Sequence, residues 1–452
     1  MSARPHPASR RAPALRRAFL AALLAAAAIA LAAPASHGQT YPTPMRMLPP
    51  DFWQAKEFAF IKEGDVFHLF WMRHNPNTPL DSTERDFGHA VSMDLRNWTQ
   101  LDPVLPVRSG SWDDLHVWTP SIVKQGDTFY MFYTGVTSVP FAWNMYQRIG
   151  VATSTDLLNW TRYDAPVWSG VQTPWAFADS SVFEGCQFRD AFVMPDTSVA
   201  GGLLMYYVTT PSNARDQLIV GAARGSDAFT WSDAGPLWST DLAHYWGWCE
   251  SPHVLEHDGL DYLFATTTSG HPLAFRVAPS PLADSTQWSG TYRIYDMANH
   301  LPVSDTWFGS EVLSVPFHDY YALVNSTGYS IDIYEIVWGP PPTFTFRTPS
   351  IASAVGPDAA GAELALSAVG RARPGQGLLL RAVVPGPCAA RVDLFDAAGR
   401  RVRTVHDGPL AAGPTLVGWD GRIGGAPAAC GIYFAALTTP AGRRVARVPV
   451  VW

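Results

Sequence analysis

The sequence predicts an all-β protein in which a five-bladed β-propeller is followed by a small β-sandwich. One aromatic-rich hairpin pattern recurs about every 60 residues between Asp51 and Thr348. Aromatic residues make up 13% of the chain and charged residues only 16%, and 38 Pro suit short strands joined by frequent turns. After Thr348 the composition changes, because Trp nearly vanishes and Ala, Gly and Arg dominate. A second, different unit is therefore expected there.

Each repeat begins with an apolar strand, a polar turn and a second strand rich in aromatic residues. The copies begin at Phe58, Pro120, Ala191, Pro252 and Glu311. The turns carry Gly64, Gly126 and Gly259, where a tight hairpin needs positive φ. The copy from Ala191 has a longer turn, and the copy from Glu311 is degenerate.

The second half of the repeat supplies two more strands. GHAVSMDLRNWTQLDPVLPV from Gly88 matches the segments that begin at Gly150 and Gly221. Alternating apolar positions predict a half-buried strand, and Asp-Leu-x-Asn-Trp marks the turn into the outer strand. Four strands in each of five units predict a five-bladed propeller. The residues just before the innermost strands then converge on one funnel.

The domain boundaries follow from these changes in pattern. We assign residues 39–348 to the propeller, 349–361 to an Ala- and Gly-rich linker and 362–452 to the sandwich. RVDLFDAAGRRVRTV, from Arg391, predicts a hairpin with Gly399 in its turn.

The N-terminal segment, residues 1–38, predicts a secretory signal peptide and hence a secreted or surface-located bacterial protein. Four Arg residues precede an apolar run from Ala18 to Ala33, and small residues predict cleavage after Ala35 or Gly38. The alternative, a membrane anchor, fits an Ala-dominated run less well, and no later segment is apolar enough to span a bilayer. The formal net charge of −7 gives no reason to expect nucleic acid as a partner.

Four cysteines remain, at Cys186, Cys249, Cys388 and Cys430. An oxidising compartment permits a disulfide within each half, and the sequence leaves the pairing open. No Cys-x-x-Cys or His-x-x-x-His pair occurs, so we expect no zinc site and no cofactor.

The first repeat closely resembles the first blade of the family 32 glycoside hydrolases, the invertase-like β-fructosidases. The match rests on residues 67–71 (Phe-His-Leu-Phe-Trp), 88–92 (Gly-His-Ala-Val-Ser) and the Asp94-Leu95-x-x-Trp98 turn. The family 43 arabinan- and xylan-degrading enzymes share this propeller. The resemblance covers four repeats well, the fifth poorly and the C-terminal unit not at all. It implies three acidic residues at the mouth of the funnel, from blades one, three and four.

Blades three and four supply two of these acids. Phe188-Arg189-Asp190 is similar to the family's Arg-Asp-Pro, with Ala191 in place of Pro. Residues 248–252 (Trp-Cys-Glu-Ser-Pro) are similar to the family's Trp-Glu-Cys-Pro with Glu and Cys exchanged. The resemblance implies that Asp190, with Arg189 supporting it, stabilises the transition state and that Glu250 is the general acid. The alternative is a structural ion pair and a carboxylate that caps a strand end.

Blade one departs most from the family, because Asn-Asp-Pro-Asn-Gly is absent. Counting back from the aromatic strands makes Glu57 equivalent to Thr119 and places it where the family has aspartate. The resemblance implies that Glu57 is the base or nucleophile, and we expect Lys56 beside it to lower its pKa. Cleavage of a glycosidic bond needs one protonated carboxylic acid and one ionised carboxylate. Glu57 therefore either serves as a repositioned base or nucleophile, or marks a copy that has lost catalysis.

Other residues near the starts of the inner strands complete a sugar site. Aromatic faces stack on sugar C–H groups, and polar side chains bind hydroxyls. The candidates are, for stacking, Trp53, Trp118 and Trp248 and, for hydroxyl recognition, Asp113, Asp114 and His116. His271 either reaches the axis, where some family 43 enzymes hold a calcium ion, or is a solvated loop residue.

The C-terminal unit resembles the immunoglobulin-like module related to the flagellar hook-capping protein and to secretion sorting domains. Residues 396–400, 418–421 and 431–433 carry the match. It implies contact with the cell surface or secretion machinery.

Two functions remain open from the sequence. One is a secreted glycoside hydrolase acting on a furanosyl or pentosyl polysaccharide, and the other is a carbohydrate-binding propeller without turnover. A carboxylate in the first blade that faces Glu250 across the funnel favours the enzyme, whereas Lys56 in that place favours the binding protein.

Overall fold

The computed structural model describes most of the chain. The described residues are 43–49, 53–79, 82–138, 145–182, 185, 187–238, 249–267, 273–282, 286–294, 307–315, 318–325, 329–349, 363–369, 372, 375 and 377–451. The predicted signal peptide, nearly all of the predicted linker, Cys186, Trp248 and His271 lie outside these residues.

The first two repeats form two antiparallel four-stranded sheets. Their strands are β2 (Gln54–Glu63), β3 (Val66–His74), β4 (Phe87–Ser92) and β5 (Thr99–Val104), then β6 (His116–Gln125), β7 (Thr128–Ser138), β8 (Met145–Ser154) and β9 (Thr161–Arg162). Consecutive strands are neighbours in each sheet, which is the order that the two halves of the repeat predicted.

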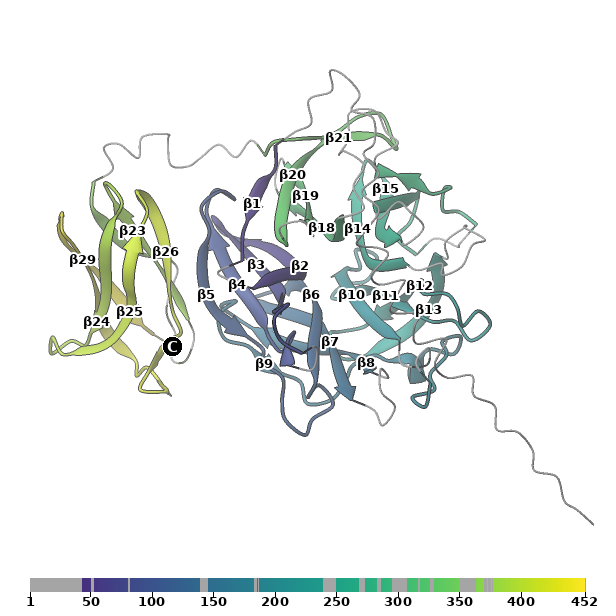
Figure 1. Ribbon diagram of the computed structural model, residues 1–452, viewed down its shortest axis with the longest axis horizontal. Coiled ribbons are helices and arrows are strands. Elements are labelled where there is room, and N and C mark those ends of the chain that lie inside the picture. Colours follow the sequence, from purple (N-terminus) through teal and green to yellow (C-terminus); the bar gives the residue numbers. More distant parts are fainter. Residues whose placement is uncertain are drawn as a thin grey trace, which may run out of the picture. The chain divides into compact units, whose positions relative to one another are not determined.

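The third and fourth repeats build two further sheets with the same strand order. Their strands are β10 (Phe188–Pro195), β11 (Leu203–Thr209), β12 (Ile219–Gly225) and β13 (Trp231–Trp238), then β14 (Cys249–His257), β15 (Leu260–Thr267), β16 (Leu273–Ala278) and β17 (Tyr292–Arg293). The first strands β2, β6, β10, β14 and, in the next sheet, β18 (Trp307–Val315) lie toward the common centre of the sheets (Figure 1).

The fifth sheet combines the two ends of this part of the chain. Its strands are β18 (Trp307–Val315), β19 (His318–Asn325), β20 (Ser330–Trp338), β21 (Phe344–Arg347) and the N-terminal β1 (Met45–Met47). β1 pairs with β20 through Met45 and Ile333, and β21 pairs farther along the same strand. The repeat pattern begins near Asp51 and so gave no sign of β1, whose three residues are too few to show a period.

Apolar layers between neighbouring sheets hold this ring together. Phe70 and Met131 belong to the layer between the first and second sheets, and Tyr206 and Leu263 belong to that between the third and fourth. Similar layers lie between the remaining neighbours, including the fifth and first sheets. Because both faces of each sheet are covered, the second strands β3, β11 and β15 are almost continuously buried.

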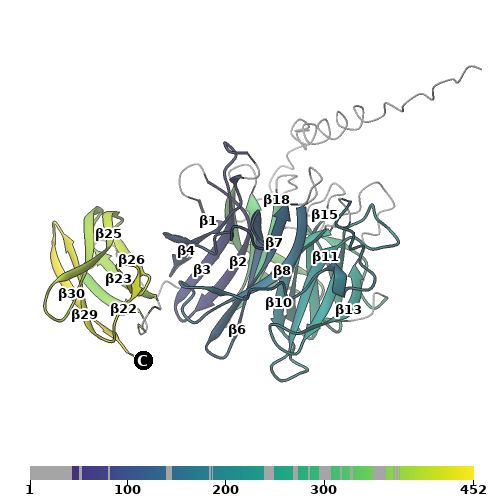
Figure 2. The ribbon, with the colours of Figure 1, turned by 90° about the horizontal axis from the view of Figure 1, so that it is seen from below.

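The C-terminal residues form two more sheets (Figure 2). One contains β22 (Ala365–Val369), β23 (Leu378–Val384) and β26 (Gly413–Trp419), and the other β25 (Arg401–Leu410), β24 (Cys388–Phe395), β29 (Gly431–Thr439) and β30 (Gly442–Val450). A short pair, β27 (Arg422–Ile423) and β28 (Ala426–Pro427), accompanies them. Leu380, Val392 and Trp419 are buried in their shared core. Gly399 has φ +76° in the predicted hairpin turn.

The prediction of an all-β protein is confirmed, since the described regular structure is strands apart from a 3-10 turn at Gly170–Gln172. Cys388 and Cys430 are not joined by a disulfide in this structure. No helix in the described ranges has the length and apolar character needed to cross a membrane.

Candidate active site

Each of the five inner strands has a β-bulge close to its N-terminal end. The register shifts fall between Ala55 and Phe58, Trp118 and Ser121, Arg189 and Phe192, Glu250 and His253, and Phe308 and Ser310. Inside them lie Glu57, Thr119, Asp190, Ser251 and Gly309, which we call the axial ring. These residues line one small cavity of about 20 Å³, which is room for a single water molecule. Bulges concentrate at sites where a side chain must be re-aimed.

The backbone of the axial ring is unusual. Thr119, Asp190 and Ser251 have φ of +43°, +58° and +49°, in a region that residues other than glycine rarely occupy. Such conformations each cost of order 1–3 kcal/mol and cluster at functional sites. The bulges therefore turn these three side chains toward the axis at the expense of backbone strain.

The Glu57 carboxylate points to the axis and is held by two hydroxyls from other sheets. Thr119 Oγ1 contacts Glu57 Oε2, and Ser251 Oγ donates a hydrogen bond to Glu57 Oε1. Burial and the negative charge of Asp190 raise the pKa of Glu57 to about 8, although both hydroxyl contacts act in the opposite direction. The expectation that Lys56 lowers this pKa is wrong, because the pKa is raised and the Lys56 ammonium is bound to a different carboxylate.

Lys56 turns away from Glu57 to another carboxylate. Its Nζ lies 2.8 Å from Glu84 Oε1, and His74 Nδ1 lies 3.0 Å from the same oxygen. These partners hold the pKa of the buried Glu84 at about 2 against the opposing effect of burial. Lys56 thus has a counter-ion of its own, and Glu57 occupies the axial place.

Arg189 joins the two acids of the third and fourth sheets. Its Nη2 lies 2.5 Å from Glu250 Oε1, and its Nε lies 3.5 Å from Asp190 Oδ2. Gln187 and Gln147 accept hydrogen bonds from Nη1. The guanidinium is buried, so its orientation is fixed by these partners.

The bulges also correct the alignment of the fourth repeat. Ser251 takes the bulge position that Asp190 takes in the third sheet, and Glu250 takes the position of Arg189. With Pro252 as the fixed point, Glu250-Ser251-Pro252 corresponds to the family's Glu-Cys-Pro. Serine therefore stands in place of cysteine, and the exchange of Glu and Cys read from the sequence is wrong.

Asp190 is buried and fully engaged in hydrogen bonds. Oδ1 lies 2.8 Å from Thr119 Oγ1, and Oδ2 accepts the Ser251 N–H at 3.2 Å. Burial raises the pKa of Asp190, while Arg189 lowers it. Thr119 has a single hydroxyl proton but contacts both Glu57 and Asp190. One of the two contacts therefore needs a proton from a carboxyl group, which agrees with the raised pKa of Glu57.

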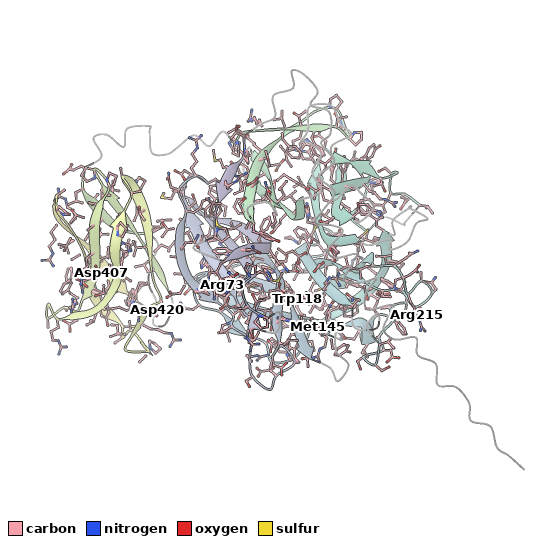
Figure 3. All side chains as sticks on the ribbon, in the orientation of Figure 1. Arg73, Trp118, Met145, Arg215, Asp407 and Asp420 are labelled. Carbon is pink, nitrogen blue, oxygen red and sulfur yellow. The ribbon has the colours of Figure 1, made fainter. Side chains whose placement is uncertain are left out.

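The predicted sugar-binding residues divide into two groups. Trp118 is half-buried, and its ring stacks on that of His116 with 5.3 Å between the ring centroids. The Arg73 Cζ atom lies 4.2 Å from the centroid of the Trp53 ring. Figure 3 labels Trp118 and Arg73. These two tryptophans remain candidates for stacking. His116 is fully buried, and its Nδ1 faces the Thr83 carbonyl at 3.0 Å. Burial lowers the pKa of His116, so it supports Trp118 from beneath as a neutral ring.

Asp113 belongs to the protein interior. Its carboxylate is 0% exposed and is shared among Arg108 at 3.1 Å, Arg162 at 3.4 Å and the Tyr133 hydroxyl at 2.9 Å. With both oxygens taken, it cannot bind a sugar hydroxyl in this structure. Asp114 is partly buried, and its backbone carbonyl accepts a hydrogen bond from Arg85.

Sequence reasoning missed the residues that surround Glu57. Thr119 served only to align the first repeat with the second, and Ser251 and Gly309 were given no role. Extending the count to all five repeats would have found Thr119 and Ser251. Two further titratable residues are among those that line the cavity: Glu311, whose pKa burial raises well above its usual value, and His253, whose pKa burial lowers to about 3. Among the described residues, no cluster of three or more His, Cys, Asp or Glu has the geometry of a metal site.

Two plant proteins are similar to parts of this chain. The β-fructofuranosidase of Arabidopsis thaliana, an insoluble isoenzyme, is 24% identical over 307 residues, which are 67% of this chain and 51% of that protein. The 6(G)-fructosyltransferase of Asparagus officinalis is 40% identical over 106 residues, which are 22% of this chain and 16% of that protein. The chain thus spans about half or less of the length of these relatives.

Solved structures share the fold at low sequence identity. The family 32 β-fructofuranosidase of Bombyx mori superimposes with a TM-score of 0.51 at 14% identity, over 90% of this chain and 88% of that one. A thermostable family 43 glycoside hydrolase does so with a TM-score of 0.50 at 17% identity, over 69% of this chain and 96% of that one. Residues 47–277 match the profile described as "Glycosyl hydrolases family 32 N-terminal domain", and this segment contains Glu57, Asp190 and Glu250. The chain therefore belongs to family 32 of the glycosyl hydrolases.

Proposed function

We propose that this protein is a secreted glycosidase that hydrolyses the O-glycosyl bond of fructofuranosyl residues or of related furanosyl or pentosyl sugars. The observation that carries the proposal is the convergence of Glu57, Asp190 and the Arg189–Glu250 pair from three different inner strands. Membership of family 32 and the fructoside chemistry named in its relatives support the choice of sugar.

Each acid has a place in the reaction. Glu250 gives a proton to the glycosidic oxygen as the bond from that oxygen to the anomeric carbon breaks. The ionised form of Glu57 attacks the anomeric carbon or removes a proton from the attacking water. Asp190, held by Arg189, stabilises the positive charge that develops on the sugar ring. Water supplies the hydroxyl of the released sugar, so the step needs no further reactant.

The competing function is a binding propeller without turnover. Two observations support the enzyme: Glu57 lines the axial cavity and senses the negative charge of Glu250, and Lys56 pairs with Glu84 instead. Only the enzyme releases a sugar product, so a measurement of product release separates the two functions.

The test is a screen of the full chain against sucrose, fructans, arabinans, xylans and mannans. We expect release of sugar from a fructofuranoside, and loss of that release in Glu57→Gln, Asp190→Asn and Glu250→Gln. Glu63→Gln is the matched control, because Glu63 lies on the same strand as Glu57 but is exposed and paired with Lys124. Sugar binding without turnover in the parent protein would establish the binding propeller, and full activity in all three variants would refute the site.

The wider architecture belongs to the same proposal. The five sheets are the blades of a five-bladed propeller, and the C-terminal sheets form an immunoglobulin-like module that contacts the cell surface or the secretion machinery. Export by removal of residues 1–38 is supported by the Arg-rich start and the apolar run. N-terminal sequencing of the secreted product tests it, and a mature chain that begins at Met1 would refute it.

A further inference from the structure

Glu57 is surrounded by residues that hold the same place in other sheets. Thr119 and Ser251 come from the second and fourth sheets, and Gly309 comes from the fifth. Thr119 and Ser251 each bring a hydroxyl to one of the two oxygens of the Glu57 carboxylate. Two hydroxyls on separate strands fix both the position and the rotation of the carboxylate plane, which one hydrogen bond would not do.

Gly309 makes room for the stem of the same side chain. A Cβ atom at this position would lie 3.0 Å from Glu57 Cγ and 3.6 Å from Glu57 Cα, and Gly309 has φ +50°. A larger residue would push the stem away and so withdraw the carboxylate from its hydroxyls. The hairpin glycines differ here, since a Cβ at Gly259 would meet nothing within 4 Å.

The length of the side chain matters as well. Aspartate at position 57 would draw the carboxylate back by about 1.5 Å, one carbon–carbon bond. Contacts at hydrogen-bond distance to two opposite strands cannot both survive that retreat. A displacement of about 1 Å in a reacting group is enough to lower turnover by about 10²-fold.

We propose that Thr119, Ser251 and Gly309 are positioning residues that form a seat specific for glutamate at position 57. The seat explains how this chain accommodates Glu where the family places Asp. Its effect on turnover rests on the proposed function, whereas its existence does not.

The first experiment needs no substrate. Thermal unfolding is measured for Gly309→Ala and for Gly259→Ala, each in the parent protein and in Glu57→Ala. Both substitutions strain a positive φ, so both lower the midpoint. In the parent, Gly309→Ala should lower the unfolding midpoint more than Gly259→Ala does. In the Glu57→Ala background the two substitutions should lower it equally, because there is no Cγ at position 57 to displace. A difference between the two substitutions that is equally large in both backgrounds would overturn the seat.

The second experiment measures turnover and its pH dependence in the full chain. Thr119→Val and Ser251→Ala should each lower kcat by about 10²-fold, with little change in KM. Because each hydroxyl lowers the pKa of Glu57, its loss should also move the ascending limb of the kcat/KM profile to higher pH. The other groups facing this carboxyl are Asp190, Glu250, Arg189, Glu311 and His253.

Rescue separates positioning from simple loss of structure. Thr119→Ser and Ser251→Thr keep the hydroxyl and should retain kcat within a few-fold, and Glu57→Asp should lose it. Unchanged kcat and an unchanged pH limb in Thr119→Val and Ser251→Ala would overturn the seat. Full activity in Glu57→Gln would refute the proposed catalytic role instead, and the unfolding experiment would still decide whether the seat exists.

Discussion

At the hairpin end of the first two inner strands, positive φ belongs to glycine, with Gly64 at +57° and Gly126 at +59°. At the funnel end it belongs to one glycine, Gly309 at +50°, and to Thr119, Asp190 and Ser251, at +43°, +58° and +49°. The two ends of these strands need similar backbone conformations, but three of the four positive-φ residues of the axial ring are strained in them. The funnel end keeps side chains that glycine cannot supply.

Backbone strain in the inner strands lies beside the buried acids and not at the hairpin turns of the first two inner strands. Thr119 and Ser251 contact Glu57, and Asp190 contacts Thr119 and the Ser251 N–H. Strain at these positions is therefore tied to a hydrogen-bonded group of acids. The hairpin glycines lie in open surroundings instead, since a Cβ at Gly126 would meet nothing within 4 Å.

The largest expected effect is the loss of turnover when the Asp190 side chain is removed from the funnel end of its strand. Asp190→Gly should lower turnover by about 10³-fold or more, because it removes the charge that we propose stabilises the transition state. Asp190→Ala should be equally inactive but less stable than Asp190→Gly by about 1 kcal/mol, since only glycine relieves the φ of +58°. Activity assays and urea unfolding of both variants check this. An alanine variant as stable as the glycine variant would show that the backbone is unstrained.

Asp113 tests whether a buried acid outside the axial ring is structural. Asp113→Ala should lower the free energy of unfolding by about 3–5 kcal/mol, because Arg108 and Arg162 lose their shared buried partner. Turnover per folded molecule should stay near that of the parent. Denaturant unfolding and assays of the folded fraction measure the two quantities. A large loss of kcat at unchanged stability would place Asp113 in the site after all.

The strands were predictable because each sheet repeats one local pattern. Asp94 Oδ1 accepts the N–H groups of Arg96 and Asn97, and Asp156 Oδ1 accepts those of Leu158 and Asn159, so the Asp-Leu-x-Asn-Trp turn has the same local cause in two repeats. Such turns depend on a few neighbouring residues and can be read from sequence.

The site was predictable in part. Glu57, Asp190 and Glu250 could be placed from the repeat and the family motifs, because each stands beside the start of an inner strand. The partner of Lys56 could not, since Glu84 lies in the segment between β3 and β4, outside the repeated strands. The burial of Asp113 and the contact of Gly309 with Glu57 likewise depend on residues far apart in the sequence.

A smaller effect concerns the raised pKa of Glu57. The folded protein holds this proton up to a pH of about 8, whereas an unfolded glutamate loses it near pH 4.5. Stability should therefore fall as pH rises between these values, and Glu57→Gln, which mimics the protonated form, should be more stable than the parent at pH 7 by about 3 kcal/mol. Unfolding measured at pH 4 and pH 7 checks the sign. An advantage of Glu57→Gln that is as large at pH 4 as at pH 7 would contradict it.

The smallest effect is expected at the hairpin end. Gly126→Ala should lower the free energy of unfolding by about 1 kcal/mol, because alanine is strained at φ +59° and its Cβ would meet no neighbour within 4 Å. Turnover should not change, since the turn between β6 and β7 is at the far end of the strand from Thr119. Denaturant unfolding and kcat/KM of this variant measure both. A loss of turnover without loss of stability would mean that the hairpin end also shapes the funnel, and the contrast between the two ends of the inner strands would fail.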